Sequence, residues 1–231
     1  MEPSMENQSA LIIGAGPGLS ASLARLCHTR GMHVTLAARN TEKLGTLAAA
    51  TGADVQACDV SDESSVAKLF ATFEDRSACP DLVVFNPSAR VRGPVTDIDA
   101  EAVKQALLIS CYGGFLVGQA AAKLMLKRGR GTIAFTGATA GVKGFANSSS
   151  FAMGKFGLRG LAQAMARELA PQGIHVAHFV IDGGIASESR VPDEDNFLSP
   201  DAIAESYLHV HEQHRSAWSW EVELRPWLER F

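Results

Sequence analysis

Short apolar runs alternate with amphipathic stretches along the whole chain. The apolar runs are rich in Val, Ile, Leu and Ala, and they predict buried strands over residues 10–13, 33–38, 54–59, 81–86, 131–136, 174–181 and 221–224. Between them, apolar positions recur with the helical period and predict helices over residues 19–30, 41–51, 61–75, 98–127, 150–169 and 200–211. Thr41 and Ser61 are the expected N-caps of two of these helices.

This order of elements predicts an α/β fold. Strands that alternate with helices form right-handed βαβ units, in which helices cover both faces of a parallel sheet. We expect a single doubly wound sheet in a Rossmann-type three-layer sandwich. Residues 1–231 contain no repeat, low-complexity tract or linker, which predicts one domain. The polar stretch 187–199 is the candidate mobile loop over the substrate.

Composition excludes several classes of protein. The 231 residues are 46% hydrophobic and 20% charged with a net charge of −4, which excludes a disordered chain and a disulfide-stapled mini-protein. We expect no nucleic-acid or membrane partner, because the chain has no basic excess and no uninterrupted apolar run of about 18 residues. The amino-terminal residues lack a signal-peptide pattern. Cys27, Cys58, Cys79 and Cys111 form no closely spaced pair, which favours reduced thiols and a cytoplasmic protein.

A glycine-rich turn joins the first predicted strand to the first predicted helix. Gly14, Gly16 and Gly18 lie in this turn, where glycine lets the backbone approach a pyrophosphate at a helix N-terminus. The alternative is a tight strand-to-helix turn that binds no ligand. The flanking βαβ pattern favours a dinucleotide.

The end of the second predicted strand bears on which dinucleotide is bound. A carboxylate there would accept a hydrogen bond from a ribose 2′-hydroxyl, whereas an arginine would pair with a 2′-phosphate. The chain has Arg39 and Asn40 at this place and no carboxylate. We therefore expect NADP(H), with NAD(H) the less favoured cofactor. The alternative is a solvated loop arginine.

With these residues in place, the chain resembles the short-chain dehydrogenase/reductase (SDR) family over nearly its whole length. The family's Thr-Gly-x-x-x-Gly-x-Gly turn is matched from Ile13 onward, with Ser20 at the third glycine. The family's Tyr-x-x-x-Lys motif is matched by residues 151–155, and its Pro-Gly loop by residues 182–187 with Asp182 in place of proline. The resemblance implies a cofactor site formed by Gly14, Gly16, Pro17, Gly18, Leu19, Arg39, Asn40, Asp59, Val60, Asn86, Pro87, Lys155 and Ile185.

The same resemblance implies a catalytic set that is mostly absent. The family uses Ser, Tyr, Lys and a helical Asn. Here Ala138 stands at the serine position, Phe151 at the tyrosine position and Ser110 at the asparagine position, so Lys155 alone is retained. In the family the tyrosine is the general acid, and such catalysis contributes about 10²–10⁴-fold in rate. A substrate that is already electron-poor, such as an iminium ion or a conjugated enone, needs less help from an acid.

Several groups are candidates to replace the missing acid. The chain has only two tyrosines, Tyr112 and Tyr207. Tyr112 lies about 200° around a helix from Ser110 and should face away from the site. Ser148, Thr139 and Asp182 are further candidates. A capping or turn role is the better explanation of the two hydroxyls, and a strand-end turn explains Asp182 equally well.

Two hypotheses follow for the function. One is an NADP(H)-dependent oxidoreductase of divergent mechanism that acts on a small molecule, as a homodimer or homotetramer of the kind the resemblance implies. The other is a catalytically inactive sensor that binds a dinucleotide or ligand. We expect no metal site, because His209, His211 and His214 do not share one helix face. Arg90 and Arg92 follow the fourth strand and leave two interpretations open, an acidic substrate or, more simply, solvated loop side chains.

Overall fold

A seven-stranded parallel sheet forms the centre of the molecule. The computed structural model describes residues 5–75, 78–187, 190 and 196–228. Its strands are β1 (Ser9–Ile13), β2 (His33–Ala38), β3 (Asp54–Ala57), β4 (Leu82–Phe85), β5 (Gly131–Thr136), β6 (Ile174–Ile181) and β7 (Glu221–Leu224). Their order is β3-β2-β1-β4-β5-β6-β7, and every neighbouring pair is parallel. The predicted α/β fold class is confirmed.

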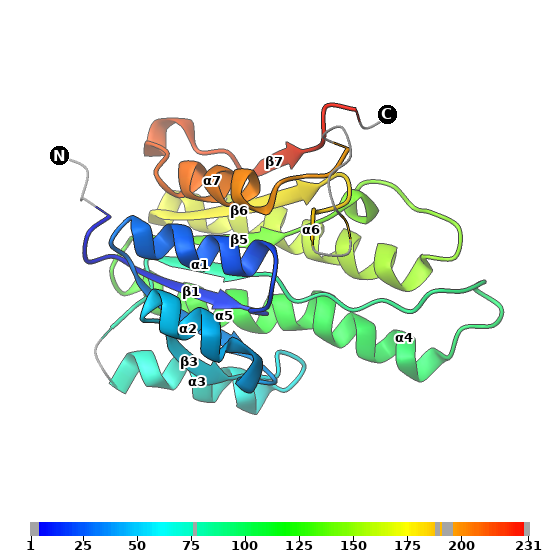
Figure 1. Cartoon of the computed structure of the whole chain (residues 1–231), viewed down its shortest axis with the longest axis horizontal. Helices are drawn as coiled ribbons and strands as arrows, with labels where there is room; N and C mark the ends of the chain where they lie inside the picture. Colours follow the sequence, from blue (N-terminus) through cyan, green and yellow to red (C-terminus); the bar gives the residue numbers. More distant parts are fainter. Residues whose placement is uncertain (1–4, 76–77, 188–189, 191–195, 229–231) are drawn as a thin grey trace.

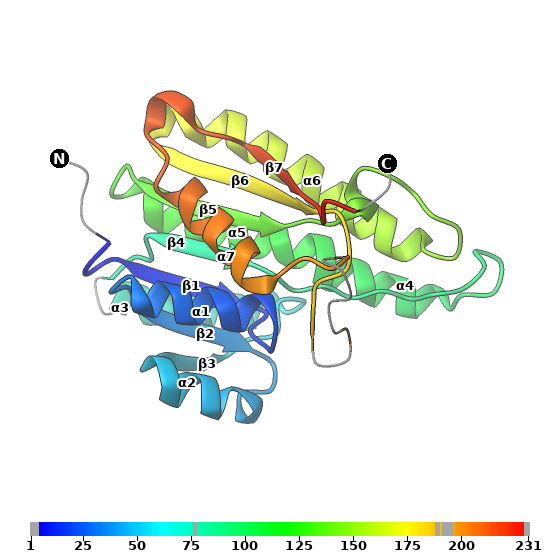
Figure 2. The same ribbon diagram turned by 45° about the horizontal axis from the view of Figure 1, so that its top comes forward.

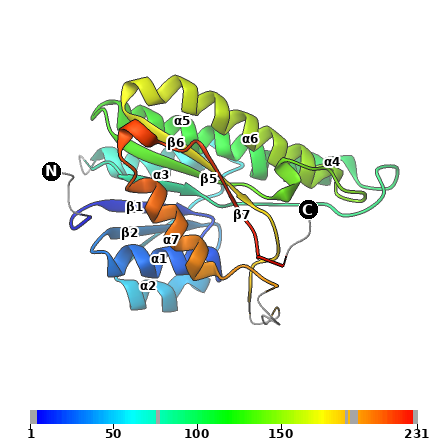
Figure 3. The same cartoon turned by 90° about the horizontal axis from the view of Figure 1, so that it is seen from above.

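Helices cover both faces of the sheet (Figures 1 and 3). One face carries α1 (Leu19–Thr29), α2 (Gly45–Thr51) and α7 (Pro200–His211). The other face carries α3 (Glu63–Asp75), α4 (Ala100–Leu107), α5 (Gly113–Leu126) and α6 (Ser149–Leu169). The carboxyl ends of the strands all point to one edge, where the segment between β4 and α4 also runs (Figure 2).

Alternating side chains of the strands build a separate core on each face. In β4, Val83 and Phe85 belong to the core under α3, α5 and α6, whereas Leu82 and Val84 belong to the core under α1 and α7. All four are fully buried. A strand that is apolar at every position is expected when helices cover both faces of a parallel sheet.

The long predicted helix over residues 98–127 contains an irregular turn. Residues Leu108–Tyr112 form a π-helix between α4 and α5. The stretch Ala100–Leu126 is long and apolar enough to span a membrane, with a mean hydropathy of 1.3 in its most apolar window. Half of that window is buried inside this fold, as in the core helix of a folded protein.

Thr41 is the N-cap residue of the short helix Glu42–Leu44, as predicted, but Ser61 is not the N-cap of α3. The side chain of Thr41 makes no capping hydrogen bond, and the Asn40 Oδ1 atom accepts from the Glu42 amide at 3.1 Å. At α3 the capping atom is Oδ1 of Asp62, which accepts from the Ser64 amide at 3.0 Å. The hydroxyl of Ser61 instead donates to Asp59 at 2.6 Å. Adjacent Ser and Asp residues are both good N-caps, so sequence alone does not choose between them.

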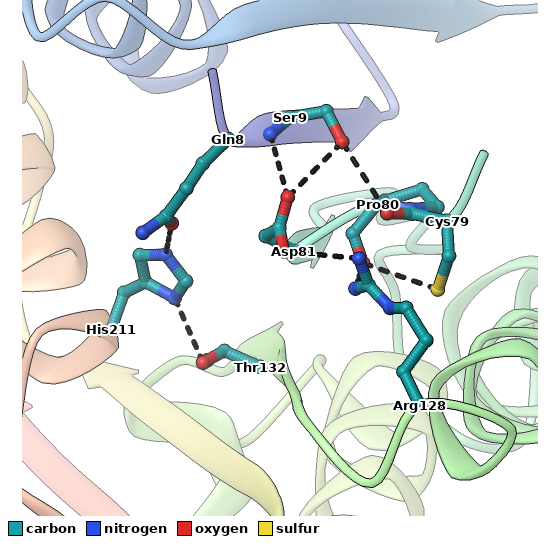
Figure 4. Close-up of polar contacts among 8 residues, drawn as sticks. All are labelled: Gln8, Ser9, Cys79, Pro80, Asp81, Arg128, Thr132 and His211. Atoms are coloured by element: carbon teal, nitrogen blue, oxygen red, sulfur yellow. Dashed lines mark hydrogen bonds and ion pairs between the residues drawn. The ribbon is translucent and has the colours of Figure 1, made fainter. Parts of the chain in front are cut away.

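Polar contacts join β1, β4, β5 and α7 at the amino edge of the sheet (Figure 4). Asp81 accepts from the Ser9 amide at 2.9 Å and pairs with Arg128 at 3.2 Å. His211 contacts the Thr132 hydroxyl and the Gln8 side chain, each at 2.8 Å. These contacts fix the edge opposite to the glycine turn.

Candidate functional site

The glycine turn lies at the carboxyl end of β1 and leads into α1. Gly14 has φ +79°, and a Cβ atom there would lie 2.7 Å from the Pro87 nitrogen. Glycine is therefore required at this position, both for its backbone conformation and for the close contact with the chain after β4. Gly18 has φ +83° and precedes α1 without providing a side-chain cap.

The next part of the turn is open. A Cβ atom added to Gly16 or Gly18 would meet nothing within 4 Å. Because no side-chain cap satisfies the first amides of α1, they remain available as donors at the positive end of the helix dipole. An open backbone cradle beside free amides fits a pyrophosphate group.

Ser20 joins the glycine turn to the fourth strand. It is buried, and its hydroxyl donates to the Gly14 carbonyl at 3.2 Å. The Asn86 Nδ2 atom donates to the same hydroxyl at 2.8 Å. The sequence identified Ser20 only as a departure from the family glycine. Its role in linking Gly14 to Asn86 depends on contacts between residues far apart in the chain.

The ends of β2 and β3 lie next to this turn. Arg39 is exposed. Asp59 accepts from the amide and the hydroxyl of Ser61, and these hydrogen bonds, with a smaller effect of Arg39, hold the pKa of Asp59 below its usual value. Val60 is buried under the start of α5, where a Cβ on Gly113 would come within 2.8 Å of the Val60 carbonyl oxygen. Arg39 and Asp59 thus carry opposite charges at one corner of the cradle.

A cavity of about 430 Å³ opens at the same edge of the sheet. Its lining includes Asn86, Phe151, Lys155, Ala138 and Ile185. Several residues that the sequence assigned to the cofactor and catalytic sets therefore lie around one cavity in the folded chain.

Lys155 is the buried cation of this cavity. It is 2% exposed, and its Nζ atom donates to the Thr136 carbonyl at 2.7 Å. Burial, with a smaller contribution from Arg90, lowers the pKa of Lys155 to about 8. Its ammonium lies 5.9 Å from the ring centroid of Phe151, one helical turn earlier on α6.

Ser110 does not line the cavity, unlike Phe151 and Ala138. It is fully buried, and its hydroxyl accepts from the Ala89 amide at 2.9 Å and donates to the Ala89 carbonyl at 3.2 Å. Ser150 forms the same pair of bonds with Val91, at 2.8 Å and 2.9 Å. This role of Ser150 is not visible in the sequence, because its partner lies 59 positions away.

The two tyrosines lie outside the cavity lining. Tyr207 is buried, stacks on Phe179 with ring centroids 3.6 Å apart and shares a hydrogen bond of 2.9 Å with the Thr136 hydroxyl. Burial raises the pKa of Tyr207, so its phenol is a weaker acid than usual. Tyr112 is 41% exposed and faces away from the cavity, as its helical position predicted.

Two of the other candidate acids border the cavity and one does not. Thr139 and Ser148 are both lining residues. Asp182 instead lies 3.5 Å from Arg225 in an ion pair and is not among the lining residues. The hydroxyls of Thr139 and Ser148 are therefore placed where a ligand could accept a hydrogen bond from them.

The two arginines after β4 lie in different environments. Arg92 is exposed and does not line the cavity. Arg90 does line it, and its guanidinium carbon stands 4.0 Å above the centroid of the Phe151 ring. Arg90 is exposed as well, in line with the simpler interpretation of the sequence, but its guanidinium also stacks on a ring that lines the cavity.

A larger hollow of about 670 Å³ opens at the amino edge, beside the contacts of Figure 4. Both ring nitrogens of His211 are hydrogen-bonded there, and His175 stacks on Trp218 with centroids 4.7 Å apart. Within the described residues, no group of three or more His, Cys, Asp or Glu side chains is placed to hold a metal. The cavity at the carboxyl edge is the better candidate, because ligands of open α/β sheets bind outside the carboxyl ends of the strands.

A parallel, doubly wound sheet with an open glycine cradle defines a Rossmann-type protein. The model of the short chain dehydrogenase family matches residues 8–195, and the chain belongs to that family. It is thus an oxidoreductase of the SDR type. The family binds nicotinamide dinucleotides, acts on small molecules and commonly forms oligomers.

Individual relatives support the same assignment. An uncharacterized oxidoreductase of Staphylococcus aureus (strain USA300) is 25% identical over 96% of this chain and 98% of its own length. The (+)-borneol dehydrogenase 1 of Salvia officinalis is 30% identical over 79% of this chain and 73% of its own length. A short-chain dehydrogenase from Rhodopseudomonas palustris is 36% identical, with a TM-score of 0.84 over 96% of this chain and 100% of the other. A metagenomic SDR in complex with NADP is 25% identical, with a TM-score of 0.85 over 98% and 100%.

Proposed function

We propose that this chain is an NADP(H)-dependent oxidoreductase whose active site lacks the family's tyrosine and serine. It transfers a hydride to or from a small organic substrate, as a single-domain subunit of a cytoplasmic homodimer or homotetramer. The proposal rests on one observation: the glycine turn at residues 14–18 and the cavity are connected through the residues that follow β4. Gly14 contacts Pro87, and Asn86, next to Pro87, is bonded to Ser20 of the cradle and also lines the cavity with Lys155.

The residues that would hold the cofactor follow from this continuity. Gly16, Gly18 and the first amides of α1 would bind the pyrophosphate, and Arg39 the 2′-phosphate. Lys155 and Ile185 would face the nicotinamide end. The bound cofactor supplies the hydride. The chain itself supplies orientation, the Lys155 ammonium and a cavity at the carboxyl edge of the sheet.

Proton supply limits the substrate class. No phenol is found among the described residues that line the cavity, and Phe151 offers no exchangeable proton. The Thr139 and Ser148 hydroxyls can donate hydrogen bonds but are poor acids. The Lys155 ammonium, with a pKa of about 8, is a weak acid that already donates to the Thr136 carbonyl. We therefore infer an electron-poor substrate, such as an iminium ion or a conjugated enone, that accepts a hydride without a strong acid.

Cofactor binding is tested by filling the cradle. Gly16→Val adds a side chain where nothing lies within 4 Å, so the fold should persist while the pyrophosphate is displaced. Gly160→Ala, on α6 and also in open space, is the matched control. We expect the Kd for NADPH, measured by calorimetry, to rise about tenfold or more in the first variant and to stay unchanged in the second. Equal affinities in the two variants would contradict the proposed site.

Arg39→Ser tests the choice of dinucleotide. Loss of a charge-assisted hydrogen bond to the 2′-phosphate should weaken NADPH binding about tenfold and leave NADH binding unchanged. The measurement is the ratio of the two Kd values in wild type and variant. A wild-type ratio near one would contradict the NADP(H) assignment.

The second candidate function is a dinucleotide sensor without catalysis. The absence of a phenol among the described lining residues favours it. Consumption of NADPH with an iminium or enone substrate, abolished by Lys155→Met, would rule it out. NADPH binding without turnover of any carbonyl, imine or enone would support it over the oxidoreductase.

A further inference from the structure

Two buried serines hold one short segment at the mouth of the cavity. Ser110 exchanges a pair of hydrogen bonds with the backbone of Ala89, and Ser150 does the same with Val91. Ser110 is fully buried and Ser150 is 1% exposed. The residue between the two anchored positions is Arg90. Its backbone is therefore fixed on both sides by contacts with two different helical segments.

The side chain of Arg90 is positioned as well. Its guanidinium carbon lies 4.0 Å above the Phe151 centroid, the geometry of a cation–π contact. Stacking uses the flat face of the guanidinium and leaves the N–H donors in its plane. Among the described residues, none forms a hydrogen bond or ion pair with this guanidinium. Arg90 thus has donors to offer to a ligand.

The charged side chains among the described lining residues all have one sign. Arg90, Lys155 and Arg190 are lining residues, and the described lining contains no Asp or Glu. Lys155 already donates to the Thr136 carbonyl. Cations that line a cavity in this way raise the local concentration of anions.

We propose that Arg90 binds a carboxylate of the substrate, so that the substrate class is small, electron-poor acids. This inference rests on the proposed function and deepens it. Arginine stays protonated in proteins, so Arg90 orients the substrate and donates hydrogen bonds without transferring a proton. A planar guanidinium matches a carboxylate in two parallel hydrogen bonds. Phe151 supports this arrangement by providing a ring face for the guanidinium.

The test uses a charged and a neutral probe of the same shape. Benzoate and benzamide are titrated by calorimetry into the protein, first alone and then saturated with NADP⁺. We expect benzoate to bind at least about tenfold more tightly than benzamide, the effect of a charge-assisted pair. Arg90→Gln should abolish this preference. Arg92→Gln, which changes a neighbouring arginine outside the cavity lining, should retain it.

The role of the serines is tested separately. Ser150→Ala frees the backbone of Val91, whereas Ser149→Ala alters the adjacent residue, which is not part of the contact with Val91. We expect weaker benzoate binding only in the first variant, with the Kd for NADP⁺ unchanged in both. Weaker binding of NADP⁺ and benzoate together would indicate a general structural effect and contradict a positioning role.

The outcomes separate this inference from the proposed function. Equal affinity for benzoate and benzamide, or a preference that survives Arg90→Gln, overturns the assignment of Arg90 while NADP⁺ binding remains. A protein that does not bind NADP⁺ would overturn the proposed function. The NADP⁺ titration measures this independently of the benzoate titration.

Discussion

Phe151 is the residue on which the chemistry of the cavity depends most directly. It is 9% exposed, stacks under Arg90 and lies one helical turn from Lys155. A ring here preserves the packing of α6 but supplies no acid. Packing by an aromatic ring and proton donation by a phenol are thus separable properties at this position.

Restoring the phenol should therefore change the reaction rather than the fold. We expect Phe151→Tyr to raise NADPH-dependent reduction of an unactivated ketone about tenfold or more. That is below the full effect of a general acid, because Ala138 still provides no hydroxyl. Phe156→Tyr, at a 44% exposed position on the same helix, is the control. Steady-state NADPH oxidation is the measurement, and equal rates for the two variants would contradict a catalytic meaning for position 151.

Arg90 also shows the limit of sequence reasoning at the scale of a residue. The chain places it after β4 with no local sign of whether it faces solvent or the site. The contacts that decide this come from Ser110 and Ser150, which lie 21 and 59 positions from their partners. Hydroxyl-to-backbone contacts of that kind have no periodicity and no composition signature.

At the scale of elements, β6 contains a buried histidine that makes stability depend on pH. His178 is fully buried, and burial lowers its pKa to about 4 although its Nδ1 atom lies 3.0 Å from Glu221. In the unfolded chain a histidine has a pKa of about 6.5. The unfolded state therefore takes up a proton first as the pH falls, so the stabilisation is complete above about pH 6.5 and decreases toward pH 4.

The expected size of this effect is measurable. Between pH 7 and pH 5 the free energy of unfolding should decrease by about 2 kcal/mol on account of His178. His178→Asn should reduce the dependence by this amount and leave the part due to His211, whose pKa burial also lowers to about 4. His209→Gln, at an exposed position on α7, is the control and should leave the curve as in wild type. Urea denaturation at several pH values is the measurement. Parallel curves for wild type and His178→Asn would contradict the assignment.

Most elements were predictable because their periodicities are strong. The strands 131–136, 174–181 and 221–224 match the observed bounds, as does the helix 200–211. The π-helix at Leu108–Tyr112 was not predictable, because one irregular turn leaves the apolar period of a long helix nearly unchanged. The N-cap of α3 was misassigned because Ser61 and Asp62 are adjacent residues that both cap well.

At the scale of the whole molecule, an apolar surface lies over α4, α5 and α6. Leu107, Cys111, Tyr112, Phe115 and Met153 line a hollow of about 550 Å³ on it. Met153 is 53% exposed and Phe115 is 41% exposed. Exposed apolar patches of this kind mark interaction surfaces. They support the proposal that the protein is a homo-oligomer.

A charge on this surface should separate the subunits. We expect wild type to elute above the 24.5 kDa of one chain in size exclusion with light scattering, and Met153→Glu to shift toward that mass. Val95→Glu places the same charge on a 76% exposed residue away from this surface and should leave the mass unchanged. A monomeric wild type would contradict the proposed assembly.

The doubly wound fold and the location of the site were predictable from the whole sequence, since both follow from the order of strands, helices and glycines. The shape and charge of the cavity were not, because they depend on which side chains meet across the sheet edge. Lys155 and Phe151 could be paired by their spacing on one helix. The sequence offered Arg90 and Arg92 equally for an acidic substrate, and only the folded molecule distinguishes them.

The segment around Arg90 belongs to no helix or strand. The amides of Ala89 and Val91 in this segment nevertheless donate to the buried hydroxyls of Ser110 and Ser150. Exchange of these two protons with solvent requires α6 or the turn at Ser110 to open locally. In deuterated water they should therefore exchange as slowly as amides of the flanking helices, whereas a solvated loop exchanges at once. Slow exchange at these two positions would identify a rigid site formed by irregular backbone.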